Sequence, residues 1–292
     1  MKDYSFISVI ECRNCNPNGD PLNDNIPRND GRGHAEMSPV CIGHKLRVEA
    51  EFAKEKIFLT GSGADGHNCL NDRTQAAYPD FNKEKKQSLV AAQKKQAEAL
   101  NKAFWDCRMF GFLVPSSNNG EKKALSIQMA QTVDPVDFRD IQITKCVGLE
   151  APKAVEKKNA NGDGEGEYNL TRSSDTMGML HIIDFGLMVI RGRICGDFAE
   201  EHGVTEKDIE LLKDCLVNMF EHDGCLARPA GSMMVRNVFW FEPENKRLME
   251  SKVYDAFHAE HKEGIDKPQR YQDYNIWVDD IPGVRCTDLT EG

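Results

Sequence analysis

The sequence predicts an α+β fold in which helices pack on one face of a β-sheet. Two hydrophobic periods occur along the 292 residues. Apolar residues alternate at 4–12, as in a strand, and recur every three or four positions at 42–57 and 209–220, as in helices. The resulting order of strand, loop, helix, insertions, strands, helix and strand favours helices on one face of a sheet.

The first strand, YSFISVIEC at residues 4–12, is rich in β-branched and aromatic residues. The stretch at 13–34, RNCNPNGDPLNDNIPRNDGRGH, is dense in Asn, Asp, Gly and Pro. These residue types build turns, so we expect a long, polar, functional loop.

A helix is expected directly after this loop. Ser38 and Pro39 form the pair that is typical of an N-cap and a first helical position. Apolar residues at helical spacing then predict about four to five turns. They are Ile42, Leu46, Ala50, Ala53 and Ile57.

Residues 60–81 lack a sustained period, which predicts an exposed connection, and 83–110 predict a second helix. The lysines of this helix fit nucleic-acid contact, but interleaved glutamates fit a solvated face as well. The solvated face is the simpler interpretation. These lysines are Lys83, Lys85, Lys86, Lys94, Lys95 and Lys102.

Strand character returns at 125–133, 141–147 and 182–195, while 150–168 has almost nothing apolar to bury and is expected to be mobile. Thr205, with Asp208 three residues later, predicts a capped third helix that ends near 222–224. Residues 233–241 form the last clear strand.

No linker divides the chain, so residues 1–292 are expected to form a single domain. The order of elements favours a ferredoxin-type, RNA-recognition-like core. Insertions are expected at about 60–120, largely helical, and at about 145–180, as a hairpin.

The formal charge of −10 and pI near 5.4 argue against a protein that coats nucleic acid with its whole surface. Any nucleic-acid site must be a local basic groove. Residues 242–292 hold twelve Asp or Glu against seven Lys or Arg, so half of the negative charge lies there. The ten cysteines are scattered along the chain and are expected to be reduced. No segment approaches the roughly 20 apolar residues of a membrane span. Together these features predict a cytoplasmic protein.

Two motifs suggest metal or redox chemistry, each with a simpler explanation. Cys12 and Cys15 have the spacing of a zinc or dithiol pair, but a structural zinc site needs a second ligand pair and none follows. Asp20, Asp24 and Asp30 share one loop and can bind a divalent ion, although their Asn, Gly and Pro neighbours favour turn formation. GSGADG lacks the Lys-Ser or Lys-Thr pair of a phosphate-binding loop.

Lys45 and Arg47 flank Leu46 on the predicted helix, so their charged groups should leave the apolar stripe on opposite sides. Together with NPNGDP and Arg28 they can grip phosphates. Two long side chains that lie along a helix surface are the simpler explanation.

Several of these segments together resemble a known family. NPNGDP, PRND, VC followed by Lys45 and Arg47, FWDCRMFG, LSIQMAQTVDP, SDTMGMLHIIDFGL and NMFEHD occur in order between about residues 4 and 245. They resemble the backbone subunit of the type I-C Cascade complex, a member of the RAMP superfamily of CRISPR proteins. Beyond residue 241 little resemblance remains.

The resemblance implies an antiviral surveillance complex in which several copies of the chain form a helical oligomer along one CRISPR guide RNA. Each copy would have an RNA-recognition-like palm, finger insertions and a thumb hairpin that contacts its neighbour. Other Cascade subunits would complete the assembly, target DNA would pair with the guide, and the chain itself would need no cofactor or metal and would cleave nothing.

Carried onto this sequence, the guide-binding region of the palm matches the loop and the following helix. The thumb matches the segment from 141 to 181, with contacts expected on its basic, thioether and imidazole side chains. The expected RNA-binding residues are Asn16, Asn18, Arg28, Lys45, Arg47, Arg172, Met177 and His181.

Two alternatives remain open at this point. A RAMP endoribonuclease would use a loop aspartate such as Asp24 or Asp30 to cleave guide-paired RNA. A metalloprotein would be built around Cys12 and Cys15.

Overall fold

An antiparallel sheet of eight strands forms the centre of the structure, which is a computed structural model. It describes residues 1–61, 63, 65–67, 69–144 and 177–291, and the backbone of 153–156 and 168–171. Six strands lie in the order β14-β11-β1-β10-β6-β2, and β5 and β7 also pair with β10. Their bounds are β1 Tyr4–Cys15, β2 Glu36–Met37, β5 Leu125–Ile127, β6 Ala130–Thr132, β7 Phe138–Thr144, β10 Met177–Ile194, β11 Met233–Pro243 and β14 Val284–Asp288. The α+β expectation is confirmed.

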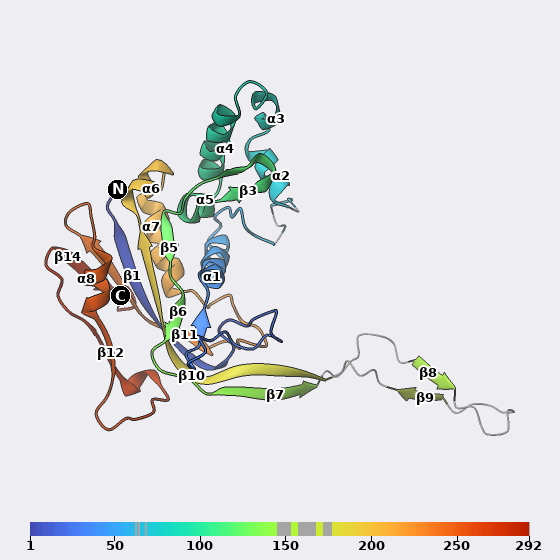
Figure 1. The fold of residues 1–292 in the computed structure, drawn as a ribbon, viewed down its shortest axis with the longest axis vertical. Helices are drawn as coiled ribbons and strands as arrows, with labels where there is room; N and C mark the ends of the chain where they lie inside the picture. Colours follow the sequence, from blue (N-terminus) through green and yellow to red (C-terminus); the bar gives the residue numbers. More distant parts are fainter. Residues whose placement is uncertain are drawn as a thin grey trace.

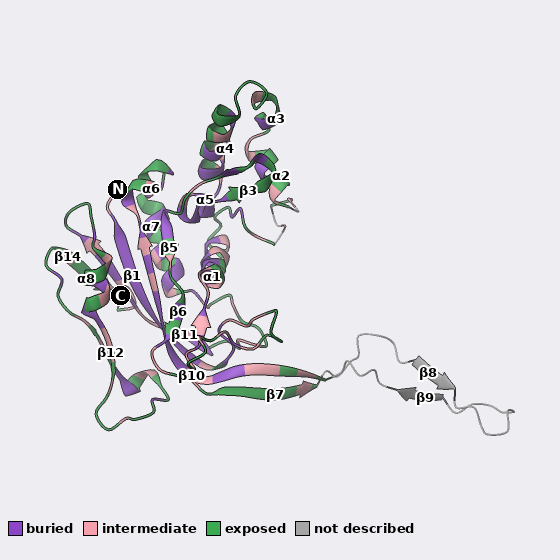
Figure 2. Cartoon of the chain, in the orientation of Figure 1, coloured by how far each residue is buried: buried purple, intermediate pink, exposed green. Residues whose placement is uncertain are grey.

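The predicted first strand is the middle of this sheet. β1 pairs with β10 on one side and with β11 on the other, so its backbone hydrogen bonds are satisfied along both edges. Phe6 and Ile10 point into one apolar cluster, while Ile7 and Val9 point into another. Both faces of the sheet are therefore covered, and Figure 2 shows β1 buried along most of its length.

Helices cover the first face, as the sequence predicts. In α1 (Pro39–Phe52) the Ser38 side chain accepts a hydrogen bond from the Cys41 backbone, and Ile42, Leu46 and Ala50 are buried. The helix ends at Phe52, near the lower end of the four to five turns expected and before the last residue of the stripe. Ile57, the last residue of the predicted stripe, is buried from the segment that follows.

The third predicted helix is α7 (Glu206–Val217), and it begins with the expected capping box between Thr205 and Asp208. It ends before the predicted 222–224 turn. A short helix that the sequence did not indicate, α6 (Gly196–Glu201), precedes it. Ile209, Leu212 and Leu216 carry the apolar stripe of α7 into the same cluster as α1.

The second face is covered by the C-terminal region, in which the sequence shows no clear helix or strand after residue 241. After β11 the chain forms α8 (Glu250–Ala256), the hairpin of β12 (Phe257–His261) and β13 (Tyr274–Val278), and β14. Val253, Phe257 and Tyr274 pack against the sheet residues Ile7 and Leu187. The expectation that helices cover one face alone is therefore wrong, since α8 lies on the second face. The sequence did not indicate this layer because its apolar residues are too widely spaced to show a period.

The insertion between α1 and β5 has a small core of its own. It contains α2 (Leu70–Ala77), α3 (Phe81–Glu84), α4 (Leu89–Ala103), α5 (Trp105–Phe110) and the short pair β3 (Leu113–Val114) and β4 (Asn119–Gly120). Phe58, Leu100 and Phe112 belong to its apolar cluster. Figure 1 shows these helices projecting from one end of the sheet.

Two expectations for this insertion are wrong. Residues 60–81 are not simply an exposed connection, because α2 lies within them and Arg73 and Thr74 are buried. Three helices, α3, α4 and α5, replace the single helix predicted for 83–110. Ser88 caps the start of α4, and Phe104 adopts an extended backbone conformation that separates α4 from α5.

A two-stranded arm leaves the opposite end of the sheet (Figure 1). We define the arm as β7 together with residues 177–183 of β10, which pair with it. The rest of β10 runs between β1 and β5 in the sheet, so one continuous strand joins the arm to the core. Beyond the arm, β8 (Lys153–Glu156) pairs with β9 (Tyr168–Thr171). The remainder of the segment expected to be mobile lies outside the described residues.

No helix in the part of the chain that the structure describes is long and apolar enough to cross a membrane.

Candidate nucleic-acid interface

The polar loop at 13–34 is held in place by its own asparagines. The Asn16 side chain is buried and donates a hydrogen bond to the Asn25 carbonyl at 2.6 Å. The Asn18 side chain accepts one from the Ser38 backbone N–H at 2.9 Å, at the start of α1. Both predicted RNA-binding asparagines therefore shape the loop and fix it to the helix.

Arg28 is the predicted loop residue whose charge faces solvent. Its side chain is 37% exposed and pairs with Asp20 at 3.1 Å. The Arg28 backbone N–H donates to the Asn18 carbonyl at 2.9 Å. A partly exposed ion pair is weak, so the guanidinium can exchange Asp20 for another anion at little cost.

Lys45 is buried, with 2% of its side chain exposed, and forms an ion pair with Asp223 in the turn after α7. Arg228 donates to the same Asp223 Oδ2 atom at 2.7 Å, so one carboxylate serves two cations. The Lys45 ammonium also lies 5.4 Å from the centre of the Phe220 ring. In this arrangement Lys45 joins α1 to the end of α7.

Arg47 leaves α1 on the other side, as the helical spacing predicts. Its Nε donates to Asp106 at 2.9 Å, and its guanidinium stacks 4.3 Å from the centre of the Phe110 ring. Asp106 also accepts backbone hydrogen bonds from Phe58 and Leu59 at 2.7 and 3.0 Å. Arg47 thus ties α1 to α5 and to the insertion.

The arm places two predicted residues in one row. Successive residues of a strand point to opposite faces, so Met177, Met179 and His181 share one face of the arm. Met177 and Met179 are 59% and 53% exposed. His181 Nδ1 contacts Asp140 Oδ1 on the partner strand at 2.6 Å. Arg172, the remaining predicted residue, lies outside the described residues.

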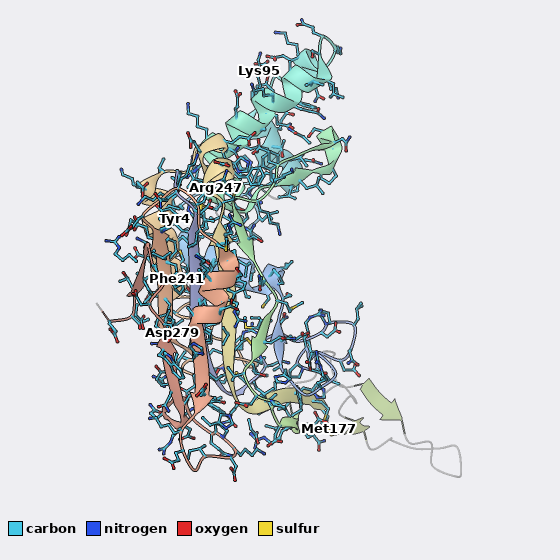
Figure 3. All side chains as sticks on the ribbon, turned by 60° about the vertical axis from the view of Figure 1, so that its left-hand side comes forward. Tyr4, Lys95, Met177, Phe241, Arg247 and Asp279 are labelled. Carbon is cyan, nitrogen blue, oxygen red and sulfur yellow. The ribbon has the colours of Figure 1, made fainter. Side chains whose placement is uncertain are left out.

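Met177 and the lysine-bearing helix lie at opposite ends of the molecule. Figure 3 labels Met177 on the arm and Lys95 on α4. Lys95 pairs with Glu84 at 2.7 Å, and its side chain is 56% exposed. This geometry suits the solvated face that the sequence favours.

Sequence reasoning missed a cavity of about 440 Å³ at the base of the arm. Its basic side chains come from three segments that are distant in the chain, namely β1, β7 and residues 261–267, which is why no local pattern indicated them. Each has an acidic partner: Arg13 with Glu11, Arg139 with Asp184, His261 with Asp134, and Lys267 with Asp137. The charges of this cavity are therefore largely balanced.

Cys12 and Cys15 are both buried, and their thiols are hydrogen-bonded to each other. A hydrogen bond between the two thiols raises the pKa of Cys12 and lowers the pKa of Cys15. Among residues 1–61, 63, 65–67, 69–144 and 177–291, no three His, Cys, Asp or Glu residues gather as a metal site would require.

The loop aspartates take part in turns. Asp30 Oδ1 accepts backbone hydrogen bonds from Arg32 and His34 at 2.8 and 3.2 Å. Asp24 is exposed, with a positive φ of 48°. Turn formation, the simpler of the two explanations, accounts for the Asp30 contacts.

Comparison with known proteins identifies the family. None of the curated proteins compared with the chain matches it. A solved chain titled "CRISPR RNA-guided surveillance complex, pre-nicking" is similar at a TM-score of 0.50 and 12% identity, over 85% of this chain and 80% of that one. A second, titled "CRISPR RNA-guided surveillance complex", has a TM-score of 0.40 and 13% identity, over 85% and 72%. The family model described as CRISPR-associated protein Cas7 matches residues 2–279, and the chain therefore belongs to the Cas7 family.

Proposed function

We propose that the chain is a guide-RNA-binding backbone subunit of a type I Cascade surveillance complex and that it resembles the type I-C version. Copies polymerise along the CRISPR RNA in the cytoplasm, together with other Cascade subunits, and present the guide for pairing with target DNA. The observation that carries this proposal is the Cas7 family match over residues 2–279. The similar solved chain, whose title names an RNA-guided surveillance complex, supports it through its fold.

The topology supports an RNA-recognition-like palm. In chain order the core runs β1, α1, β6, β10, α7, β11, and in the sheet the strands lie β11-β1-β10-β6. This is the βαββαβ arrangement of ferredoxin-like folds. Residues of about 60–120 and 145–180 would then be the finger and thumb insertions of one domain.

The covered sheet changes where RNA would bind. RNA-recognition domains stack bases on an open sheet face. In this chain Ile7, Leu187 and Phe241 lie under the C-terminal region and are inaccessible. The guide would therefore contact the loop and the arm at the end of the sheet.

Within that interface the predicted residues would divide into two groups. Arg28 would bind phosphate, Met177 and His181 on the arm would contact a base, and Arg172 stays a predicted contact. Asn16, Asn18, Lys45 and Arg47 would act mainly by holding the loop and α1 in position, since each already has protein partners.

Co-purification tests the proposal. Protein purified from cells that express a CRISPR array should carry RNA, seen as a raised ratio of absorbance at 260 nm to that at 280 nm, and sequencing should return repeat-derived guides. Protein without RNA, or with random cellular RNA, would contradict guide binding. Incubation of the loaded protein with complementary RNA and magnesium should give no cuts. Regularly spaced cuts would establish the endoribonuclease alternative.

A further inference from the structure

Arg191 stands out because it is half-buried with no acidic partner in the described part of the chain. It lies on β10, on the sheet face that the C-terminal region covers, beside Val189. Its guanidinium lies 5.4 and 6.0 Å from the ring centres of Tyr254 and Phe257. Its Nε is buried and has no hydrogen-bond partner among the described residues.

This placement is costly unless something neutralises the charge. A buried charge is normally paired, and contacts with aromatic rings only partly replace water. Burial lowers the pKa of Arg191, while the neighbouring Tyr254 acts in the opposite direction. An anion beside the guanidinium would remove the penalty.

A cavity of about 390 Å³ lies next to Arg191 and brings two further basic groups to it. Arg32, with 85% of its side chain exposed, and His34 line the cavity from the polar loop. The His34 Nδ1 faces the Thr132 carbonyl at 2.9 Å, and since a carbonyl only accepts, Nδ1 carries the proton and Nε2 is the ring's other polar atom.

The acidic residue of this cavity is already engaged. Asp30 lines it too, but its carboxylate accepts the backbone N–H groups of Arg32 and His34 and lies 3.3 Å from Arg32 Nε. Its side chain is 8% exposed. In the cavity at the base of the arm, by contrast, each of the basic side chains has a carboxylate partner. Of these two cavities, the one beside Arg191 therefore has an excess of positive charge.

We propose that Arg191, with Arg32 and His34, binds a phosphodiester group of the guide RNA, an inference that rests on the proposed function. Guanidinium groups match the geometry of phosphate oxygens and carry no base preference. Arg28 and Arg32 belong to the same loop. An RNA strand bound at Arg28 would therefore reach this cavity by following the loop from residue 28 to residue 34. The site would extend the RNA path from the loop to the side of the sheet where β6 and β2 lie.

The experiment compares Arg191→Met and Arg191→Lys with wild-type protein and with a control, Arg285→Met. Arg285 is 73% exposed and pairs with Glu242 on the far edge of the sheet. Arg285→Met removes one positive charge, as Arg191→Met does, but far from the cavity. Affinity for single-stranded RNA is measured against salt concentration, and thermal unfolding is measured for each protein.

Arg191→Met should keep its melting temperature within about 3 °C of wild type, because no ion pair is lost. Its RNA affinity should fall about tenfold, and the slope of log affinity against log salt should flatten by about 0.7. Arg191→Lys should retain most of the slope, and Arg285→Met should match wild type. Wild-type affinity and slope in Arg191→Met would overturn the site.

Two further arms keep the test decisive. If Arg191→Met fails to fold, Arg32→Gln at an exposed position must flatten the slope, and an unchanged slope overturns the site. Inorganic phosphate should raise the melting temperature of wild type above that in chloride of equal ionic strength, and Arg191→Met should lose this effect. Phosphate stabilisation without any change in RNA affinity would assign the cavity to free phosphate and overturn the proposal. Wild-type protein that binds no RNA contradicts the proposed function, and with it the assignment of the cavity to guide RNA. The phosphate arm then shows separately whether Arg191 binds an anion.

Discussion

The Lys45 ammonium donates a hydrogen bond to the Asp223 carboxylate, although the two residues lie 178 positions apart in the chain. Lys45 is one of the expected RNA-binding residues, and under the proposal it acts mainly by holding α1 in position through this contact.

Replacement of Lys45 by Ala should destabilise the protein. The change removes a buried cation and leaves Asp223 with Arg228 as its remaining partner. We expect a loss of roughly 1–3 kcal/mol in the free energy of unfolding, less than for a fully orphaned buried charge. Urea unfolding followed by circular dichroism measures it.

Lys94→Ala is the control, since Lys94 is exposed on α4 and its loss should change stability by less than about 0.5 kcal/mol. Equal stability of Lys45→Ala and wild type would show that the buried ion pair contributes nothing.

Arg28→Gln should weaken guide binding without harm to the fold. Its ion pair with Asp20 is partly exposed and contributes little to stability. Loss of one phosphate contact should flatten the slope of log affinity against log salt by about 0.7. Fluorescence anisotropy with a labelled single-stranded RNA measures the slope. A Lys94→Gln variant with the same charge change should keep the wild-type slope, and the opposite ranking of the two variants would place the groove on α4.

The double change of Met177 and Met179 to Ser should leave the monomer intact, because both side chains are more than half exposed. Unfolding free energy should change by less than about 0.5 kcal/mol for each. Loading onto RNA and assembly should fall, since the apolar row of the arm is lost. Size-exclusion chromatography of the protein with guide RNA follows the assembly. Met249→Ser, at a methionine that is 61% exposed before α8, is the matched control and should assemble normally.

Asp65 should make stability depend on acidity. The hydrogen bond from Arg73 holds the pKa of Asp65 at about 2, below its ordinary value of 3.8. A depressed folded-state pKa stabilises the protein above pH 3.8, and this contribution is lost as pH falls from about 4 to 2. The gap in stability between wild type and Asp65→Asn should therefore be largest near pH 7 and shrink towards pH 2.

Urea unfolding at a series of pH values measures this gap. Asp255→Asn, at an exposed position of α8, should show a small difference from wild type at every pH. A gap for Asp65→Asn that stays constant down to pH 2 would contradict the role of the Arg73 hydrogen bond.

The sequence by itself determined the elements whose signals are local. The alternation and the β-branched and aromatic residues at 4–12 predicted β1. Ser38 and Pro39 predicted the start of α1, and Thr205 with Asp208 predicted the cap of α7. At the two helix starts the stabilising contact joins residues a few positions apart, and in β1 the signal is a local residue pattern although its partner strands are distant, so composition and spacing are sufficient evidence.

Only the tertiary structure decided which charges are free. Lys45 and Arg47 have the pattern of exposed donors, but Asp223 and Asp106 meet them from distant segments. Arg191 occupies an ordinary strand position, and it differs from its neighbours because α8 and β12 place aromatic rings over it without a carboxylate. Burial and pairing depend on contacts between residues that are remote in the chain, and local spacing carries no record of them.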